Sequence, residues 1–190
     1  MENERFEEIF KDENYKETVF EKKRFENCKF INCNFLGADI KKCSFVDCIF
    51  DNSNFSMVKL SPETKIQNSS FVESKIVGIN FSLLSDFLTF FDFKNCLLKH
   101  CNFSDLKLKN VKFTNCLIDG CDFMNTDLNS SSFKKSRFID TFFENSDLQK
   151  SNFLGAEGFT INPTSNKLYG AKFNKSEVFG LLKDFGIKFE

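Results

Sequence analysis

The residues of this chain that could carry chemistry are eight cysteines, one histidine and several acidic residues. The cysteines are Cys28, Cys33, Cys43, Cys48, Cys96, Cys101, Cys116 and Cys121. Some lie twenty residues apart, as Cys96 and Cys116 do, and stacked side chains at that spacing could form a disulfide. The simpler interpretation is that each cysteine is a reduced, small filler of a narrow interior.

None of these residues forms a recognisable metal or catalytic motif. The Cys-x4-Cys spacing lacks the short C-x2-C knuckle of zinc sites, and His100 is the only histidine of the chain. The sequence also lacks a Gly-rich phosphate loop, a Cys/His or His/Asp/Ser constellation and a pair of acids placed in a pocket. We therefore expect a protein that is not an enzyme and that uses no metal and no cofactor.

A five-residue repeat organises most of the chain. From Phe20 a large apolar residue recurs at every fifth position to Leu60, then from Ile66 to Phe81 and, after a second slip of register, from Leu88 to Phe153. All eight cysteines lie two positions before such a centre. A period of five fits neither an α-helix nor a simple β-strand. It indicates a chain that turns a corner every five residues and points one large and one small side chain inward on each side.

A second period of twenty residues gives the number of sides. Phenylalanine recurs at this spacing in two series, and leucine in a third. The series are Phe93, Phe113, Phe133 and Phe153; Phe103, Phe123 and Phe143; and Leu108, Leu128 and Leu148. Four fives make one turn of a square coil, with successive coils about 4.8 Å apart. Two opposite sides are expected to carry phenylalanine ladders and the other two mostly aliphatic ladders.

Individual units resemble the consensus A(D/N)LXX of the pentapeptide-repeat family. Examples are Cys33-Asn34-Phe35-Leu36-Gly37 and Cys121-Asp122-Phe123-Met124-Asn125. The resemblance covers about residues 18–158. It implies an all-β solenoid, a right-handed quadrilateral β-helix of about seven coils in this chain.

We expect three parts, because the open edges of a β-helix must be covered. Residues 1–17 are expected to form an N-terminal arm or cap, with Asn3–Lys11 as a short helix or arm. Residues 18–158 are expected to form the coil. Residues 159–190 are expected to form a C-terminal cap that contains one more repeat unit, Ala171-Lys172-Phe173, and the dimerisation helix. In this cap a short α-helix is predicted to start at Ser176 and to stop at Gly186.

Two segments interrupt the repeat, namely Ser61–Lys65 and Ser82–Phe91. The second contains Leu83, Leu84, Phe87 and Phe90 without a clean five-residue frame. It is either a bulge that packs on its own coil or an exposed apolar patch for a partner.

The end of the chain, Gly180-Leu181-Leu182-Lys183-Asp184-Phe185-Gly186-Ile187, resembles the end of the Qnr and MfpA branch of the family. That branch is associated with fluoroquinolone resistance. The resemblance implies a homodimer joined at the C-terminus, which imitates B-form DNA and binds DNA gyrase or topoisomerase IV. The expected dimer interface is Val178, Leu181, Leu182, Phe185 and Ile187. A monomer capped by its own helix is the alternative.

The charge of the chain is nearly balanced, with 26 basic and 27 acidic residues. We therefore expect no direct binding of nucleic acid and no attachment to a membrane. A cytoplasmic location is expected, because Met1–Phe10 is acidic and lacks the apolar core of a signal peptide. A local acidic face for a partner is predicted at Asp119, Asp122, Asp127, Asp140, Glu144 and Asp147. The alternatives are that these acids are simply a solvated surface and that the rod is a structural or protein-interaction scaffold for another partner.

Overall fold

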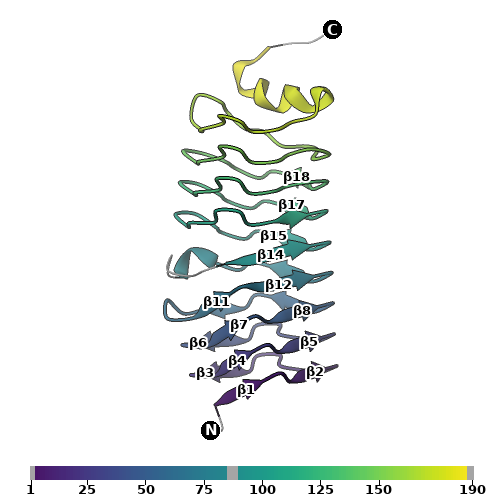
Figure 1. Cartoon of the computed structure of the whole chain (residues 1–190), viewed down its shortest axis with the longest axis vertical. Coiled ribbons are helices and arrows are strands. Elements are labelled where there is room, and N and C mark those ends of the chain that lie inside the picture. The colour runs from purple at the N-terminus through teal and green to yellow at the C-terminus, as the bar shows by residue number, and fades with distance from the viewer. Residues whose placement is uncertain (1–2, 85–89, 188–190) are drawn as a thin grey trace.

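The computed structural model describes residues 3–84 and 90–187, and these residues form a rod of stacked, four-sided coils (Figure 1). Parallel ladders run along its four sides, which we number faces 1 to 4 in chain order. Face 1 contains β1 (Glu4–Phe6), β4 (Arg24–Glu26), β7 (Ser44–Val46) and β11 (Lys65–Gln67). Face 2 contains β2 (Ile9–Lys11), β5 (Lys29–Ile31), β8 (Ile49–Asp51), β12 (Ser69–Val72), β14 (Phe91–Lys94) and β16 (Phe113–Thr114).

The other two faces complete each turn. Face 3 contains β9 (Asn54–Ser56), β13 (Lys75–Val77), β15 (Leu97–Lys99), β17 (Leu117–Asp119) and β18 (Arg137–Ile139). Face 4 contains β3 (Val19–Glu21), β6 (Asp39–Lys41) and β10 (Lys59–Leu60). Nearer the C-terminus the ladders continue as single bridges, such as Asn102 to Asp122 and Asp122 to Phe142 on face 4.

The corner of each repeat is a residue in the left-handed backbone region, two positions after the inward centre. Asn27, Asn32, Asn115 and Asn125 have φ of 54°, 55°, 54° and 53°. Asparagine tolerates this region better than most residues because its short polar side chain can hydrogen-bond locally. The chain therefore turns a corner every five residues, as the repeat predicts.

Aromatic rings fill the interior. On face 2 the rings stack without interruption from Phe10 to Phe173, with centroid distances from 4.7 to 5.2 Å. On face 4 the stack runs from Phe81 through Phe103 and Phe123 to Phe143. The predicted pair of opposite phenylalanine ladders is thus confirmed for the C-terminal coils. The N-terminal coils differ, because Phe25 and Phe45 on face 1 and Phe35 and Phe55 on face 3 also stack.

Small residues two positions before each centre complete the core. All eight cysteines are buried and free, as the placement of the repeat predicts. Hydroxyl residues at the same positions join the coils: Ser136 donates to the carbonyl of Phe113 at 2.9 Å and accepts from the N–H of Cys116 at 3.0 Å. These inward hydroxyls satisfy backbone groups that the corners remove from the ladder.

The prediction of an N-terminal helix or arm at Asn3–Lys11 is wrong. β1 pairs with β4, and β2 pairs with β5, so this segment is already part of the first coil. Phe10 stacks on Phe30, and Tyr15 packs against Phe35 at 5.0 Å. The repeat is hard to see there because Arg5 occupies a centre position in the register that pairs it with Phe25.

Both interruptions are insertions between paired strands. Around Pro62 the register grows by one residue, so that Ile66 pairs with Phe45, and the buried Thr64 donates to the carbonyl of Ile40. In the second, the 3₁₀ helix η1 (Phe81–Leu83) follows Asn80, and Phe93 pairs with Phe71. Leu84 and Phe91 are buried, whereas Leu83 and Phe90 are exposed. The predicted centre Leu88, together with Asp86 and Phe87, lies outside the described residues.

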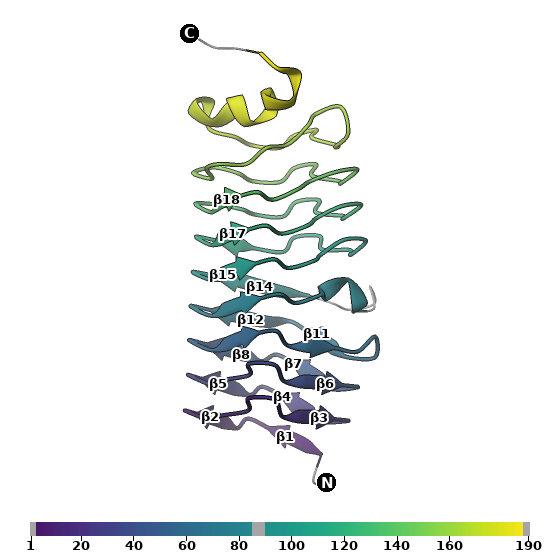
Figure 2. The ribbon, with the colours of Figure 1, turned by 180° about the vertical axis from the view of Figure 1, so that it is seen from behind.

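At the C-terminal end two short helices lie across the last coil (Figure 2). They are η2 (Lys175–Leu181) and η3 (Lys183–Phe185). The predicted helix is present, but it is 3₁₀ rather than α, and its N-cap is Asn174 rather than Ser176. Gly180 lies within it, and glycine is a poor α-helix former. Gly186 ends η3 with a φ of 65°, as predicted.

Candidate interaction surfaces

The six acids predicted to form one partner-binding face lie on three faces of the rod. Asp127 and Asp147 are on face 1, where they are bridge partners. Asp119 is in β17 on face 3, and Asp140 follows β18 at the next corner. Asp122 and Glu144 are on face 4, on either side of the centres Phe123 and Phe143 in the sequence. Acids that are close in sequence therefore point in different directions.

Basic residues neighbour the acids of faces 1 and 3. The face 1 column runs Lys107, Asp127, Asp147, Lys167 from coil to coil. The Nζ of Lys109 also lies 3.3 Å from Asp127 Oδ2. On face 3, Lys99 Nζ lies 2.7 Å from Asp119 Oδ2. A partner would thus meet charges of both signs on these two faces.

Face 4 is different in its C-terminal half. Its segments 101–106, 121–126 and 141–146 contain no lysine or arginine. They carry Asp105, Asp122 and Glu144, one in each successive coil, and we call these three residues the acidic strip. Asp105 accepts from the Nδ2 of Asn125 at 3.1 Å, and Asp122 accepts from the N–H of Met124 at 2.8 Å. These contacts fix the carboxylates without neutralising them.

Sequence reasoning missed Asp105, although the twenty-residue period could have found it. Asp105 and Asn125 are twenty residues apart and stack at one corner of face 4. Asp122 and Asp127 are close in the sequence, and the sequence-based prediction therefore places them on one face. In the structure Asp122 stacks instead on the residues twenty positions before and after it, Asn102 and Phe142.

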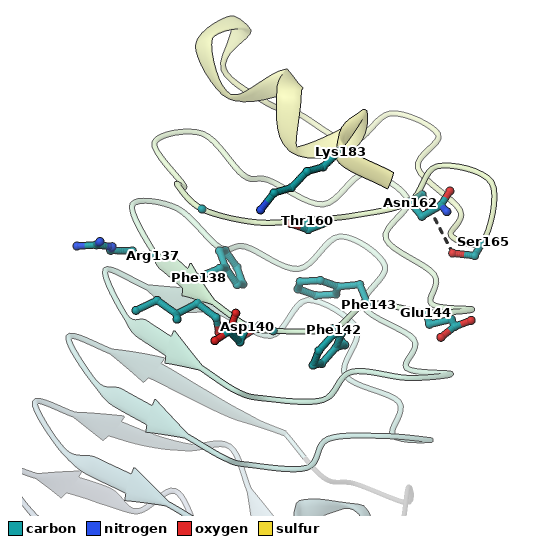
Figure 3. Close-up of a pocket in the computed structure, with 13 residues that line it drawn as sticks. Arg137, Phe138, Asp140, Phe142, Phe143, Glu144, Thr160, Asn162, Ser165 and Lys183 are labelled. Atoms are coloured by element: carbon teal, nitrogen blue, oxygen red, sulfur yellow. Dashed lines mark hydrogen bonds between the residues drawn. The ribbon is translucent and has the colours of Figure 1, made fainter. Parts of the chain in front are cut away.

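A groove opens at the C-terminal end of the acidic strip (Figure 3). It has a volume of about 710 Å³. Its floor is the last regular coil, Arg137 to Glu144, and its other side is formed by Gly158, Thr160, Asn162, Ser165 and Lys183. Phe142 lies beside the groove with 65 % of its surface exposed.

The residues predicted for a dimer interface lie at the C-terminal tip of the rod. Val178, Leu181 and Leu182 are half-buried, and Leu181 packs against the core. Phe185 and Ile187 are 50 % and 51 % exposed, and Phe179 on the same helices is 50 % exposed. The helices therefore cover the last coil with one side and leave apolar side chains on the other.

All eight thiols are buried in the part of the chain that the structure describes. Burial raises the pKa of Cys48 to about 12. A hydrogen bond with the Cys96 thiol, together with burial, raises the pKa of Cys116. Among residues 3–84 and 90–187, no three His, Cys, Asp or Glu side chains are grouped to hold a metal ion. In the same residues no helix has the length and apolar character needed to cross a bilayer.

The four-sided parallel coil with a corner at every fifth residue defines the class of this chain. Its fold is that of pentapeptide-repeat proteins, and the family profile described as pentapeptide repeats (8 copies) matches residues 19–61. A second profile, described as the SV2A/B/C luminal domain, matches residues 79–164. A search of the curated proteins finds no significant match.

Among solved structures, the fold is similar to that of QnrB1, described as a plasmid-mediated fluoroquinolone resistance protein. One trypsin-treated form is 18% identical, with a TM-score of 0.64, and the alignment covers 98% of this chain and 100% of that one. A second trypsin-treated form is 16% identical, with a TM-score of 0.58 and coverage of 98% and 91%. Full-length QnrB1 is 19% identical, with a TM-score of 0.53 and coverage of 97% and 100%. These likenesses establish the fold.

Proposed function

We propose that this chain is a Qnr-like binding protein that uses the acidic strip of its rod to engage a type II topoisomerase, DNA gyrase or topoisomerase IV, as a DNA mimic. In this role it confers fluoroquinolone resistance. The observation that carries the proposal is the full-length likeness to QnrB1 combined with three carboxylates, one in each of three successive coils, on a part of face 4 without basic residues. The likeness alone concerns the fold, and function depends on the surface that the fold presents.

The acidic strip is suited to a site that normally holds DNA. Its carboxylates are on successive coils, whose spacing is about 4.8 Å, and duplex DNA carries one charge per about 1.7 Å of its axis. The strip thus carries charge of the same sign as DNA at a lower density along the rod. Electrostatic complementarity of this kind mainly determines the rate and specificity of association.

The test is a supercoiling assay with purified gyrase and topoisomerase IV, with and without ciprofloxacin, in which this protein is titrated. We expect it to relieve inhibition by ciprofloxacin or to inhibit supercoiling at micromolar concentration. Salt should weaken the effect, because exposed charges are screened. No effect on either enzyme would contradict the proposal.

A matched pair of variants separates the acidic strip from the other acids. Asp122→Lys with Glu144→Lys reverses two charges on face 4 and should abolish the effect. Asp127→Lys with Asp147→Lys makes the same change in net charge on face 1 and should leave it largely intact. Equal loss in both variants would assign the effect to net charge rather than to the strip.

A second candidate is a protein-interaction scaffold with another partner. It is favoured by the nearly neutral net charge and by the mixed columns of face 1, which do not resemble DNA. A protein that leaves both topoisomerases unaffected but is recovered with one specific partner would support this candidate.

A further inference from the structure

The groove above face 4 is a gap in the hydrogen-bond ladder between two coils. One coil lower, the ladder is complete: the N–H groups of Gly120, Phe123 and Asn125 donate to carbonyls at 2.9, 2.9 and 2.8 Å. The acceptors belong to Ile139, Phe142 and Glu144, which form the floor of the groove.

The equivalent donors one coil higher are the N–H groups of Asp140, Phe143 and Asn145. None of the three donates to any acceptor among the described residues. The carbonyl of Thr141 also receives no N–H there, whereas the carbonyl of Cys121, twenty residues earlier, accepts from Phe142 at 3.0 Å. From Asp140 to Asn145 the chain therefore presents N–H, C=O, N–H and N–H groups in sequence, none of which has a hydrogen-bond partner among the described residues.

The ladder is intact on both sides of the gap. Phe138 donates to the carbonyl of Glu157 at 2.8 Å, and Lys167 donates to the carbonyl of Ser146 at 3.0 Å. Only the segment in between, residues 158–166, leaves the coil. The opening is thus a local interruption in a continuing structure and not the frayed end of the rod.

The sequence explains why the chain leaves the ladder here. Gly158 stands where a large centre would follow Phe138, and Pro163 stands twenty residues after Phe143. Phe159 and Ile161 turn into the end of the core, and the N–H of Ile161 donates to the carbonyl of Gly180 at 3.0 Å. Asn162 closes a turn by accepting from the N–H of Thr164 at 2.8 Å. Asn166 does reach the floor, because its Nδ2 donates to the carbonyl of Phe143 at 2.8 Å. The segment supplies no acceptor to the N–H groups of Asp140, Phe143 and Asn145.

We propose that this groove binds an extended segment of a partner protein, which adds to the floor as one parallel strand. A peptide backbone carries donors and acceptors in the alternation that Asp140, Thr141 and Phe143 require, and edge addition is a recurrent mode of peptide recognition. The volume of about 710 Å³ lies in the range of sites that bind small ligands. The proposal does not depend on an interaction with a topoisomerase.

The register of the coil specifies which side chains the guest segment needs. The residue that pairs with Phe142 faces outward and gains an apolar contact with its ring, since cross-strand aromatic and aliphatic pairs are stabilising. The next residue pairs with Phe143, which lines the groove. The one after that lies opposite Glu144, where the acidic strip favours lysine or arginine. A small residue opposite Thr141 and a glycine at the corner opposite Asp140 complete the unit.

At the other end of the groove the charges are reversed. Toward that end the groove is lined by two basic residues, Arg137 and Lys183, and one acid, Asp140, as Figure 3 shows. Because the guest strand runs parallel to the floor, its N-terminal end is expected to be acidic and its C-terminal end basic. The blocked hexapeptide acetyl-Glu-Gly-Ala-Val-Leu-Lys-amide meets all these requirements and serves as the probe.

The first measurement is amide hydrogen exchange by NMR on the free protein. The amides of Asp140, Phe143 and Asn145 should exchange at least about tenfold faster than those of Gly120, Phe123 and Asn125, since they lack acceptors. Saturation with the probe should slow the first three and leave the other three unchanged. Equal protection in the free protein would mean that the chain closes its own gap, and would overturn the proposal.

The second measurement compares binding of modified probes and variants. Methylation of the valine nitrogen removes the donor to Thr141 and should weaken binding about tenfold. Glu144→Lys should weaken binding by a similar factor, and a probe ending in glutamate should restore it. Asp127→Lys makes the same charge change on face 1, outside the groove, and is the control. Binding that is indifferent to N-methylation, or no binding, would refute strand addition. Protection that rises with protein concentration alone would assign the groove to a second copy and also overturn it.

Discussion

Phe113 and Phe123 meet edge to face across the interior of the coil, with centroids 5.6 Å apart and ring planes at 90°. Each ring is also stacked on the next coil: Phe113 on Phe133 at 5.1 Å and 6°, and Phe123 on Phe143 at 5.0 Å and 6°. The edge-to-face arrangement matches the preference of the aromatic quadrupole. The ladder fixes the spacing between coils, so neighbouring rings cannot move in to replace one that is lost.

The first prediction concerns this core. Phe123→Ala should leave a cavity between Phe103 and Phe143 and lower the free energy of unfolding by about 3–5 kcal/mol. Met124→Ala removes the next side chain, which points outward, and should cost less than about 0.5 kcal/mol. Urea denaturation of both variants checks the difference. Equal destabilisation would contradict the assignment of inward and outward positions.

The second prediction compares two glycines with similar backbone angles, Gly155 at φ 74° and Gly158 at φ 75°. Alanine is strained at both, but its Cβ at Gly155 would lie 3.3 Å from the flexible Lys135 side chain. At Gly158 it would lie 2.4 Å from the carbonyl oxygen of Phe138, which is backbone. Gly158→Ala should therefore cost about 1–3 kcal/mol more than Gly155→Ala. Thermal unfolding of the two variants gives the comparison, and equal melting temperatures would contradict the close approach.

The third prediction concerns reactivity of the thiols. All eight cysteines are buried, and burial raises the pKa of Cys33 and Cys43 as well as that of Cys48. Since the thiolate is the nucleophile, a bulky thiol reagent at pH 8 should label the native protein slowly and all cysteines together upon unfolding. Val19→Cys places a thiol on an exposed strand and is the positive control. Rapid native labelling of any of the eight would refute their inward placement.

The fourth prediction follows from the same pKa shift. In the unfolded chain Cys48 ionises near pH 8.5, whereas in the folded protein its pKa is about 12. Above pH 8.5 the unfolded state therefore binds fewer protons, and stability falls as pH rises toward 12, by about 1.4 kcal/mol per pH unit for this group. Below pH 8.5 the contribution is fully present. Urea midpoints between pH 7 and 11 measure the slope, and Cys48→Ala should make it shallower. An unchanged slope would contradict the shift.

Most of the fold follows from the sequence because one rule repeats: a large residue every fifth position and like residues every twentieth. The rule places Phe123 inside and Met124 outside without any structure. The rule does not detect the first coil, because Arg5 occupies a centre position there. The equivalent positions of the next two coils are Phe25 and Phe45. The helical spacing of Val178, Leu181 and Leu182 predicts a helix at the correct place, but spacing alone does not separate 3₁₀ from α.

The candidate site is less predictable than the fold. The net charge of a surface depends on which residues of neighbouring coils stack. Lys107 and Lys167 flank Asp127 and Asp147 in one column and offset their negative charge. The groove depends on the absence of bonds, which a sequence does not display. Its signal is nevertheless present in Gly158 and Pro163, two residues unsuited to the centre positions they would occupy.

The last prediction is a homodimer joined at the C-terminal tip. Phe179, Phe185 and Ile187 stay exposed at the tip although the helices already cover the end of the coil. Two-fold association is the commonest way to bury such an apolar patch. Phe179→Ser with Phe185→Ser should convert the dimer to a monomer without lowering the melting temperature of the coil by more than a few degrees. Phe142→Ser, an equally polar change at an exposed ring away from the tip, should leave the dimer intact. Sedimentation equilibrium at tens of micromolar measures the mass against the 22.1 kDa of one chain. A wild-type protein that sediments as a monomer would refute the dimer, and it would also weaken the proposal of DNA mimicry, because a single short rod offers a topoisomerase only half the length to grip.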